Sequence, residues 1–353
     1  MSLEPESGLK LGLNTGYWAA AAPPPSALES VLEAERLGFD SVWTSEAYGC
    51  DVLTPLAWWG SHTEKIRLGT AIMQISARRP TAAAMAAMTM DHLSGGRFVL
   101  GLGVSGPQVV EGWYGEPFAK PLARTREYVS IVRDVLARRE PVLSEGPHYR
   151  LPLNGHEGAT GLGKPLKSTL RPLRDGLPIY LAAEGPKNIA LTAEIADGWL
   201  ALFYSPHHDA ELYRPCLEDG FARRTTPSDG FEVLASIPFI VDDDVERAAD
   251  MVRPRFALYF GGMGARSLNF HHDVAVRMGY GAEAEKIQDL YLDGKKDEAA
   301  AAVPTRLVEE LALIGPPDKI RHDLEAWRES SVTSLLIAGP PETLRQAAEL
   351  VLG

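Results

Sequence analysis

Polar and small residues follow several apolar runs in this sequence, at positions where they could face a ligand. Glu46 follows one such run, Gln74 and Ser76 follow the next, and Ser105 follows the one after. A carboxyl group can give or take a proton, an amide can polarise a carbonyl group, and small residues let the backbone approach a flat ligand. These residue types indicate a small-molecule site with one acid–base group and a planar ligand.

A strand–helix–strand pattern positions part of this set. Residues 66–75 and 98–103 form short, nearly continuous apolar runs, which are typical of strands buried on both faces of a parallel sheet. Between them, residues 81–93 are rich in Ala and Met at helical spacing. We therefore expect Gln74 and Ser105 at the same edge of one sheet.

The alternation of strand and helix recurs along the chain. Eight apolar runs that predict strands begin near positions 9, 39, 66, 98, 177, 198, 231 and 332. No shift of composition indicates a linker, so the pattern predicts a single (β/α)8 TIM barrel over residues 1–353, with a doubly wound open sheet as the alternative. In such a barrel the site lies at the carboxyl ends of the strands, where the polar residues would meet.

Two longer segments are predicted as insertions, one after the fourth strand and one after the seventh. Residues 146–176 have the Gly and Pro density of a long loop, and residues 245–304 are rich in Ala and predict extra helices. The loop is basic, with Arg150, Lys164, Lys167, Arg171 and Arg174 against two acids. A basic segment in an acidic chain favours an anionic partner, although pairing with acids elsewhere in the protein is the alternative.

The composition favours small-molecule chemistry. The chain has 35 Lys and Arg against 47 Asp and Glu, a net charge of −12, which argues against nucleic-acid and anionic-membrane partners. Two cysteines cannot form a disulfide framework, and the pairs His207-His208 and His271-His272 lack metal-ligand spacing. With no leader pattern and no run of 18 apolar residues, we expect a cytoplasmic protein without a metal ion.

Five segments resemble the bacterial luciferase-like superfamily of TIM barrels and, within it, the coenzyme F420-dependent oxidoreductases. They are AERLGFDSVWTSE (34–46), LGTAI (68–72), DHLSGGRFVLGLGVSGPQVVEGWYG (91–115), GATGLGKPLK (158–167) and AEGPKNIALTAEIADGW (183–199). Ala47 and Gly106 stand where the F420-dependent glucose-6-phosphate dehydrogenases carry a histidine and a glutamate. The chain therefore looks more like the actinobacterial reductases and the methylene-tetrahydromethanopterin reductases.

This resemblance implies a binding site for a deazaflavin ring. It implies a non-prolyl cis peptide at Ala71-Ile72 behind the central ring of the cofactor. It also implies cofactor contacts at Glu46, Gln74, Val104, Ser105 and the segment Ala183-Glu184-Gly185-Pro186-Lys187. In that segment, free amides at a helix start together with Lys187 would suit a phosphate group.

The reaction that the resemblance implies is hydride transfer between the deazaflavin and a small organic substrate, for which the protein supplies orientation and one proton donor or acceptor. We assign the proton donor to Glu46; the alternative is that Glu46 only hydrogen-bonds the cofactor or a backbone amide. F420 carries a phosphodiester and an oligoglutamate tail that FMN lacks. We therefore expect Lys164 and Lys167 to cover that tail.

Two other functions stay open from the sequence. An FMN-dependent two-component monooxygenase would share the barrel and most motifs, and a non-catalytic F420-binding protein would bind the cofactor without hydride transfer. The residues expected to line a hydrophobic substrate pocket are Tyr17, Trp18, Tyr48, Trp113, Tyr114, Tyr204 and Gly261–Gly264. Barrels of this superfamily are usually dimeric, so we also expect a homodimer or a higher homo-oligomer.

Overall fold

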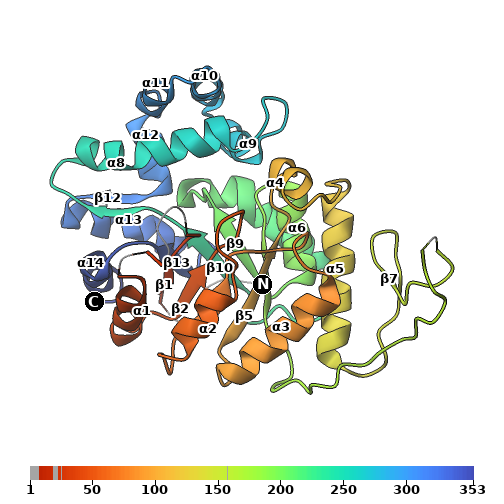
Figure 1. The fold of residues 1–353 in the computed structure, drawn as a ribbon. Coiled ribbons are helices and arrows are strands. Elements are labelled where there is room, and N and C mark those ends of the chain that lie inside the picture. The colour runs from red at the N-terminus through yellow and green to blue at the C-terminus, as the bar shows by residue number, and fades with distance from the viewer. Residues whose placement is uncertain (1–7, 19–22, 25, 157) are drawn as a thin grey trace.

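Eight parallel strands form a closed barrel in the computed structural model, which describes residues 8–353 except 19–22, 25 and 157 (Figure 1). The strands are β1 (Lys10–Asn14), β2 (Ser41–Thr44), β3 (Arg67–Thr70), β5 (Phe98–Gly103), β8 (Ile179–Ala182), β9 (Gly198–Leu202), β10 (Glu232–Ser236) and β13 (Ser334–Ile337). Each strand pairs in parallel with the next, and β13 pairs with β1 to close the ring. The predicted TIM barrel is confirmed, and the open sheet is excluded.

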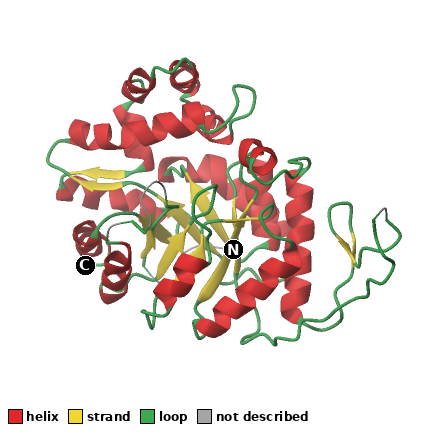
Figure 2. Cartoon of the chain, in the orientation of Figure 1, coloured by secondary structure: helices red, strands yellow, loops and turns green. Residues whose placement is uncertain are grey.

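Helices cover the outside of the barrel (Figure 2). They are α1 (Ala27–Arg36), α2 (Thr54–Gly60), α3 (Pro80–Leu93), α5 (Pro121–Ala137), α6 (Pro186–Ile195), α7 (Arg214–Arg223), α13 (Pro317–Glu329) and α14 (Pro341–Val351). Short turns η1 (Pro206–His208) and η2 (Asp209–Tyr213) precede α7. On α13, Ile320, Leu324 and Trp327 are buried at spacings of four and three, so one apolar face packs against the barrel.

Large side chains from several strands fill the barrel interior. Trp43 on β2 stacks on Tyr180 of β8, with ring centroids 5.8 Å apart. Gly69 makes room for this packing, because a Cβ atom there would lie 2.2 Å from the Trp43 ring. The interior is therefore a packed core rather than a channel.

The third strand is interrupted. The run over residues 66–75 predicted one strand, but β3 ends at Thr70 and β4 (Met73–Gln74) resumes beside the end of β5. The peptide bond between Ala71 and Ile72 is cis, as the resemblance implied. This break places Gln74 next to Gly103, at the carboxyl end of the sheet.

The seventh run also divides, because β11 (Phe239–Val241) leaves the barrel and pairs with β12 (Leu313–Gly315). The chain between these two strands forms the predicted extra helices, which we call the insertion. They are α8 (Val245–Ala257), η3 (Leu258–Gly262), α9 (Phe270–Arg277), α10 (Gly281–Leu292), α11 (Lys296–Ala301) and α12 (Thr305–Leu311). The insertion has an apolar cluster of its own, and Figure 1 shows it above the carboxyl ends of the strands.

The long basic loop forms an arm, residues 139–176, that projects sideways from the body (Figures 1 and 2). It includes the small hairpin of β6 (Ser144–Glu145) and β7 (Arg150–Leu151). Near the end of the arm, before the chain enters β8, Arg174 Nε donates to Asp91 of α3 at 3.1 Å. The arm connects the end of α5 to the start of β8, so its base lies at the amino end of the barrel.

A network of charged side chains closes that amino end. Arg67, the first residue of β3, donates to Asp40 and to Glu232, and Lys10 donates to Glu232 at 2.8 Å. Burial opposes ionisation of Glu232, but the charge of Arg67 and the hydrogen bonds from Arg67, Lys10 and Tyr180 outweigh it and lower the pKa to about 2.

Across the described part of the chain, no helix has both the length and the apolarity needed to cross a membrane.

Candidate functional site

The carboxyl ends of β4 and β5 form one wall of a small hollow. Its lining residues are Ile75, Ser76, Val104, Val110, Phe118, Pro121 and Arg124. Two buried polar atoms of this lining, Ser76 Oγ and Arg124 Nε, and Oε1 of Gln74 next to it in the chain have no hydrogen-bond partner among the described residues. Since buried polar atoms are almost always satisfied, these atoms are available to a ligand.

The backbone around the hollow departs from regular strand geometry. The cis bond at Ala71-Ile72 lies between β3 and β4, and Ser105, just beyond β5, has a left-handed backbone with φ of +58°. A Cβ atom on Gly103 would lie 2.9 Å from the Ile72 side chain, so glycine lets Ile72 pack against the end of β5. A short helix, α4 (Pro107–Gly112), begins two residues after Ser105.

Glu46 lies beneath this wall with its carboxylate fully engaged. It accepts from the backbone amides of Gln74 at 2.9 Å and Val52 at 3.3 Å, and from Arg78 Nη1 at 2.6 and 2.9 Å. Its side chain is 4% exposed. Both carboxylate oxygens are therefore engaged by partners within the protein. The contacts to the two amides correspond to the alternative role, a hydrogen bond to a backbone amide.

Gln74 is held by the same loop. Its Nε2 donates to the carbonyl oxygens of Glu46 and Ala47, each at 3.0 Å, which leaves Oε1 turned away from both. Tyr114 also donates to the carbonyl of Ala47 at 3.2 Å. Burial is the main cause that raises the pKa of Tyr114, and the charge of Glu46 adds to it.

The segment Ala183–Lys187 joins β8 to α6, as expected, but Glu184 has an unexpected partner. Its Oε1 lies 2.7 Å from Nδ1 of His271 on α9, and its backbone carbonyl accepts from Arg277 Nη2 at 2.8 Å. The insertion is therefore fastened to the carboxyl end of β8. The spacing of His271 and His272 argued only against a metal site. The contact with Glu184 was not predicted, because the two residues are 87 positions apart in the sequence.

Aromatic side chains surround the barrel mouth, in part as expected. Tyr48 lies 6.4 Å from Trp113, ring to ring, and both are more than half exposed. Tyr204 does not belong to this set, since it is 1% exposed and donates to Asp209. The glycines at 261 and 262 also face elsewhere, because Cβ atoms there would meet Tyr291 of α10. The expected lining is corrected at these positions.

Lys164 and Lys167 do not meet the other expected site residues. Lys167 Nζ donates to the carbonyl of Arg139, just after α5, and both lysines belong to the arm that starts from the amino end. Within one chain they lie at the wrong end of the barrel to cover a cofactor tail. Arg124 is the basic residue among those that line the hollow, and Arg79 stands at the N-cap of α3.

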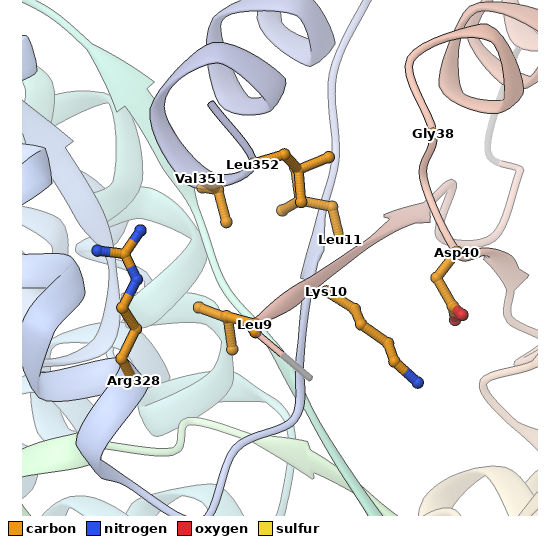
Figure 3. Close-up of a pocket in the computed structure, with 9 residues that line it drawn as sticks. Leu9, Lys10, Leu11, Gly38, Asp40, Arg328, Val351 and Leu352 are labelled. Atoms are coloured by element: carbon orange, nitrogen blue, oxygen red, sulfur yellow. The ribbon is translucent and has the colours of Figure 1, made fainter. Parts of the chain in front are cut away.

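A larger pocket, about 500 Å³ in volume, lies at the amino end (Figure 3). Leu9, Lys10 and Asp40 line it, together with Arg328 and Leu352 at the ends of α13 and α14. The amino face of a TIM barrel contributes to stability and not to catalysis, so we place the functional site at the smaller hollow. Among the described residues, no three His, Cys, Asp or Glu side chains come together as metal ligands would.

Comparisons with known proteins agree with the barrel. The family model of luciferase-like monooxygenases matches residues 9–334. The chain is 55% identical, over 98% of its length and all of the relative, to Rv3520c of Mycobacterium tuberculosis, which is named as a candidate coenzyme F420-dependent oxidoreductase. It is 29% identical, over 87% of each chain, to 5,10-methylenetetrahydromethanopterin reductase of Archaeoglobus fulgidus. The solved F420-dependent tetrahydromethanopterin reductase of Methanopyrus kandleri superimposes with a TM-score of 0.78 at 21% identity, covering 98% of this chain and 99% of that one.

Proposed function

The chain belongs to the luciferase-like monooxygenase family and is an oxidoreductase, and from this premise we propose that it transfers hydride between coenzyme F420 and a small, hydrophobic organic substrate. The observation that carries the proposal is the pair of buried oxygen atoms without partners, Gln74 Oε1 and Ser76 Oγ, beside Gly103 at the carboxyl ends of β4 and β5. The name of the Mycobacterium tuberculosis relative, which gives coenzyme F420, supports the choice of cofactor.

The residues around the hollow fit this cofactor by type. Ala71 and Ile72 would support the ring from behind, while Gln74 and Ser76 have unsatisfied oxygen atoms that suit the polar edge of a deazaflavin. When bound, the deazaflavin supplies the carbon that gives or takes the hydride. Arg79 and Arg124 give positive charge for the phosphodiester and the acidic tail, in place of Lys164 and Lys167.

Glu46 acts as a positioning residue in this proposal. Its carboxylate orders the amides of Val52 and Gln74 and holds Arg78, and the side chain of Gln74 is fixed in turn by the Glu46 carbonyl. A site geometry held by rigid supporting contacts is what hydride transfer requires, because the two reacting carbons must be close and aligned. In this proposal another residue handles the proton.

The test is a pair of fluorescence titrations with F420 and FMN on the same purified protein. We expect F420 to bind more tightly than FMN, and the protein to catalyse oxidation of reduced F420 by a member of a panel of enones, imines and aldehydes. Tighter binding of FMN together with oxygen consumption would instead identify a two-component monooxygenase. Binding of F420 with no turnover across the panel would instead identify a non-catalytic cofactor-binding protein.

The homodimer or higher homo-oligomer and the cytoplasmic location expected from the sequence are still predictions.

A further inference from the structure

The pair formed by His271 and Glu184 has the geometry of an oriented imidazole. Nδ1 of His271 lies 2.7 Å from Glu184 Oε1, and the two side chains are 19% and 13% exposed. The backbone of Glu184 is fixed by the hydrogen bond from Arg277, which is on the same helix as His271. Both members are therefore held by well-ordered elements, α9 on one side and the end of β8 on the other.

The chemistry of the pair sets the tautomer of the imidazole. An ionised carboxylate can only accept a hydrogen bond, so Nδ1 of His271 must carry the hydrogen that Glu184 receives. Nε2 then gains or loses the titrating proton. No hydrogen bond to Nε2 is found among the described residues, which leaves this nitrogen available. A carboxylate that orients a histidine in this way is a recurring arrangement for general acid–base catalysis.

The position of the pair relates it to the hollow. Phe270, the residue before His271, packs against Phe118 with ring centroids 6.3 Å apart, and Phe118 lines the hollow. Glu184 follows β8, which is the neighbour of β5 in the ring. The pair thus lies at the carboxyl end of the barrel, beside the proposed cofactor wall and on the side where the insertion covers the mouth.

We propose that His271, oriented by Glu184, is the proton donor and acceptor for the hydride transfer; this assignment rests on the proposed function. In the reductive direction, hydride adds to the electrophilic carbon of a substrate C=C, C=N or C=O bond, and the π-electron pair moves to the far atom. That atom takes the proton from Nε2 of protonated His271. The two electrons come from reduced F420, which is left oxidised. His271 remains as the neutral imidazole with its hydrogen on Nδ1.

Several titratable and charged groups surround the His271–Glu184 pair. Glu184 Oε2 is buried and has no hydrogen-bond partner among the described residues. The ring of Tyr259 lies 4.9 Å from that of His271, and Arg255 lies 5.6 Å from the Tyr259 ring. Arg277 and Asp273 are the other charged groups of α9 nearby, and the pKa of Tyr213 is raised by burial, with Arg277 opposing and Glu184 assisting the shift. Glu184 is thus the acid in hydrogen-bond contact with the imidazole.

The first test uses histidine-labelled protein and NMR of the imidazole groups. In the cofactor-free protein we expect the Nδ1-H tautomer for His271 at high pH, and loss of that preference in Glu184→Gln. Addition of F420 should shift the His271 signals and leave His272, the matched neighbour on α9, unchanged. An Nε2-H tautomer, or F420 binding that leaves the His271 signals in place, overturns the assignment. Failure of F420 to bind at all overturns the proposed function, and the assignment with it.

The second test follows turnover with the panel substrate that the wild type accepts, with cyclohex-2-en-1-one as the first probe. His271→Asn should lower kcat by about 10²–10⁴-fold while the dissociation constant for F420 changes less than about threefold. The pH dependence of kcat should lose one ionisation in this variant, and His272→Asn should behave as the wild type. A purely structural role for His271 would lower the amount of folded protein but keep the pH profile. An unchanged profile with an unchanged kcat refutes the proposal.

Discussion

The two ends of the barrel differ in their polar chemistry, because charged side chains pair with one another at the amino end and partnerless polar atoms gather at the carboxyl end. At the amino end, Arg67 has Asp40, Tyr180 and Glu232 as partners, and Lys10 shares Glu232. Charges that are buried together are stable only when each has its partners. This end also holds the larger pocket, but its polar groups are already engaged with one another.

At the carboxyl end, polar atoms are buried without partners. Gln74 Oε1, Ser76 Oγ and Glu184 Oε2 lie there beside a cis peptide and the left-handed Ser105. For this reason we place the site by its unsatisfied polar atoms and not by the size of the pocket. The difference between the two ends also shows how one fold can use one end for stability and the other for binding.

The largest expected effect is a loss of stability when the amino-end network is disrupted. Arg67→Met leaves Glu232 and Asp40 without their main partner, so the free energy of unfolding should fall by about 3–5 kcal/mol in urea denaturation. The affinity for F420 should stay within about twofold, because the hollow is at the other end. Arg321→Ala, which breaks an exposed pair with Asp318, is the control and should cost about 0–1 kcal/mol. Equal losses in both variants would contradict the network's role.

Acid should weaken the same network. Because the pKa of Glu232 is lowered from 4.5 to about 2, its contribution to stability is fully present above pH 4.5 and is lost as the pH falls through 2. The loss should reach at most about 3 kcal/mol. Urea denaturation at a series of pH values measures it, and Glu232→Gln should flatten the dependence over this window. A wild-type curve as flat as that of the variant would show that the lowered pKa is absent.

Changes beneath the cofactor wall should affect binding more than folding. Glu46→Gln leaves Arg78 without its counter-charge and weakens the bond to the Gln74 amide, so we expect F420 affinity to fall about tenfold, or about 1.4 kcal/mol. A fluorescence titration measures the affinity, and turnover at saturating F420 should change little. A normal affinity combined with lost turnover would instead restore Glu46 as the proton donor.

The smallest expected effect concerns the arm. Lys164→Glu combined with Lys167→Glu should leave F420 affinity within about twofold, since both lysines belong to the arm. Arg124→Glu at the hollow is the matched charge reversal and should weaken F420 clearly more than it weakens an analogue without the acidic tail. Loss of F420 affinity in the lysine variant would show that the arm reaches a cofactor after all, across an interface between two chains.

The order of strands and helices could be predicted from the sequence, because each buried strand is a short apolar run and the helices carry apolar residues at helical spacing. It could not show that residues 66–75 form two strands, since a change in one peptide bond leaves no mark on hydropathy. The contact between His271 and Glu184 depends on the path of the insertion. The position of Lys167 could have been predicted from the order of elements, because a segment that connects a barrel helix to the next strand starts from the amino end of the barrel.

The short ribbon of β11 and β12 has a consequence for how such enzymes diversify. Phe239 pairs with Leu313, so the chain leaves for the insertion and returns from it at neighbouring places on one side of the barrel. The segment between residues 242 and 312 is thus attached to the barrel at one place. An insertion of another length or shape could replace it while the eight-stranded barrel stays intact. The substrate range could then evolve without changes in the cofactor-binding wall.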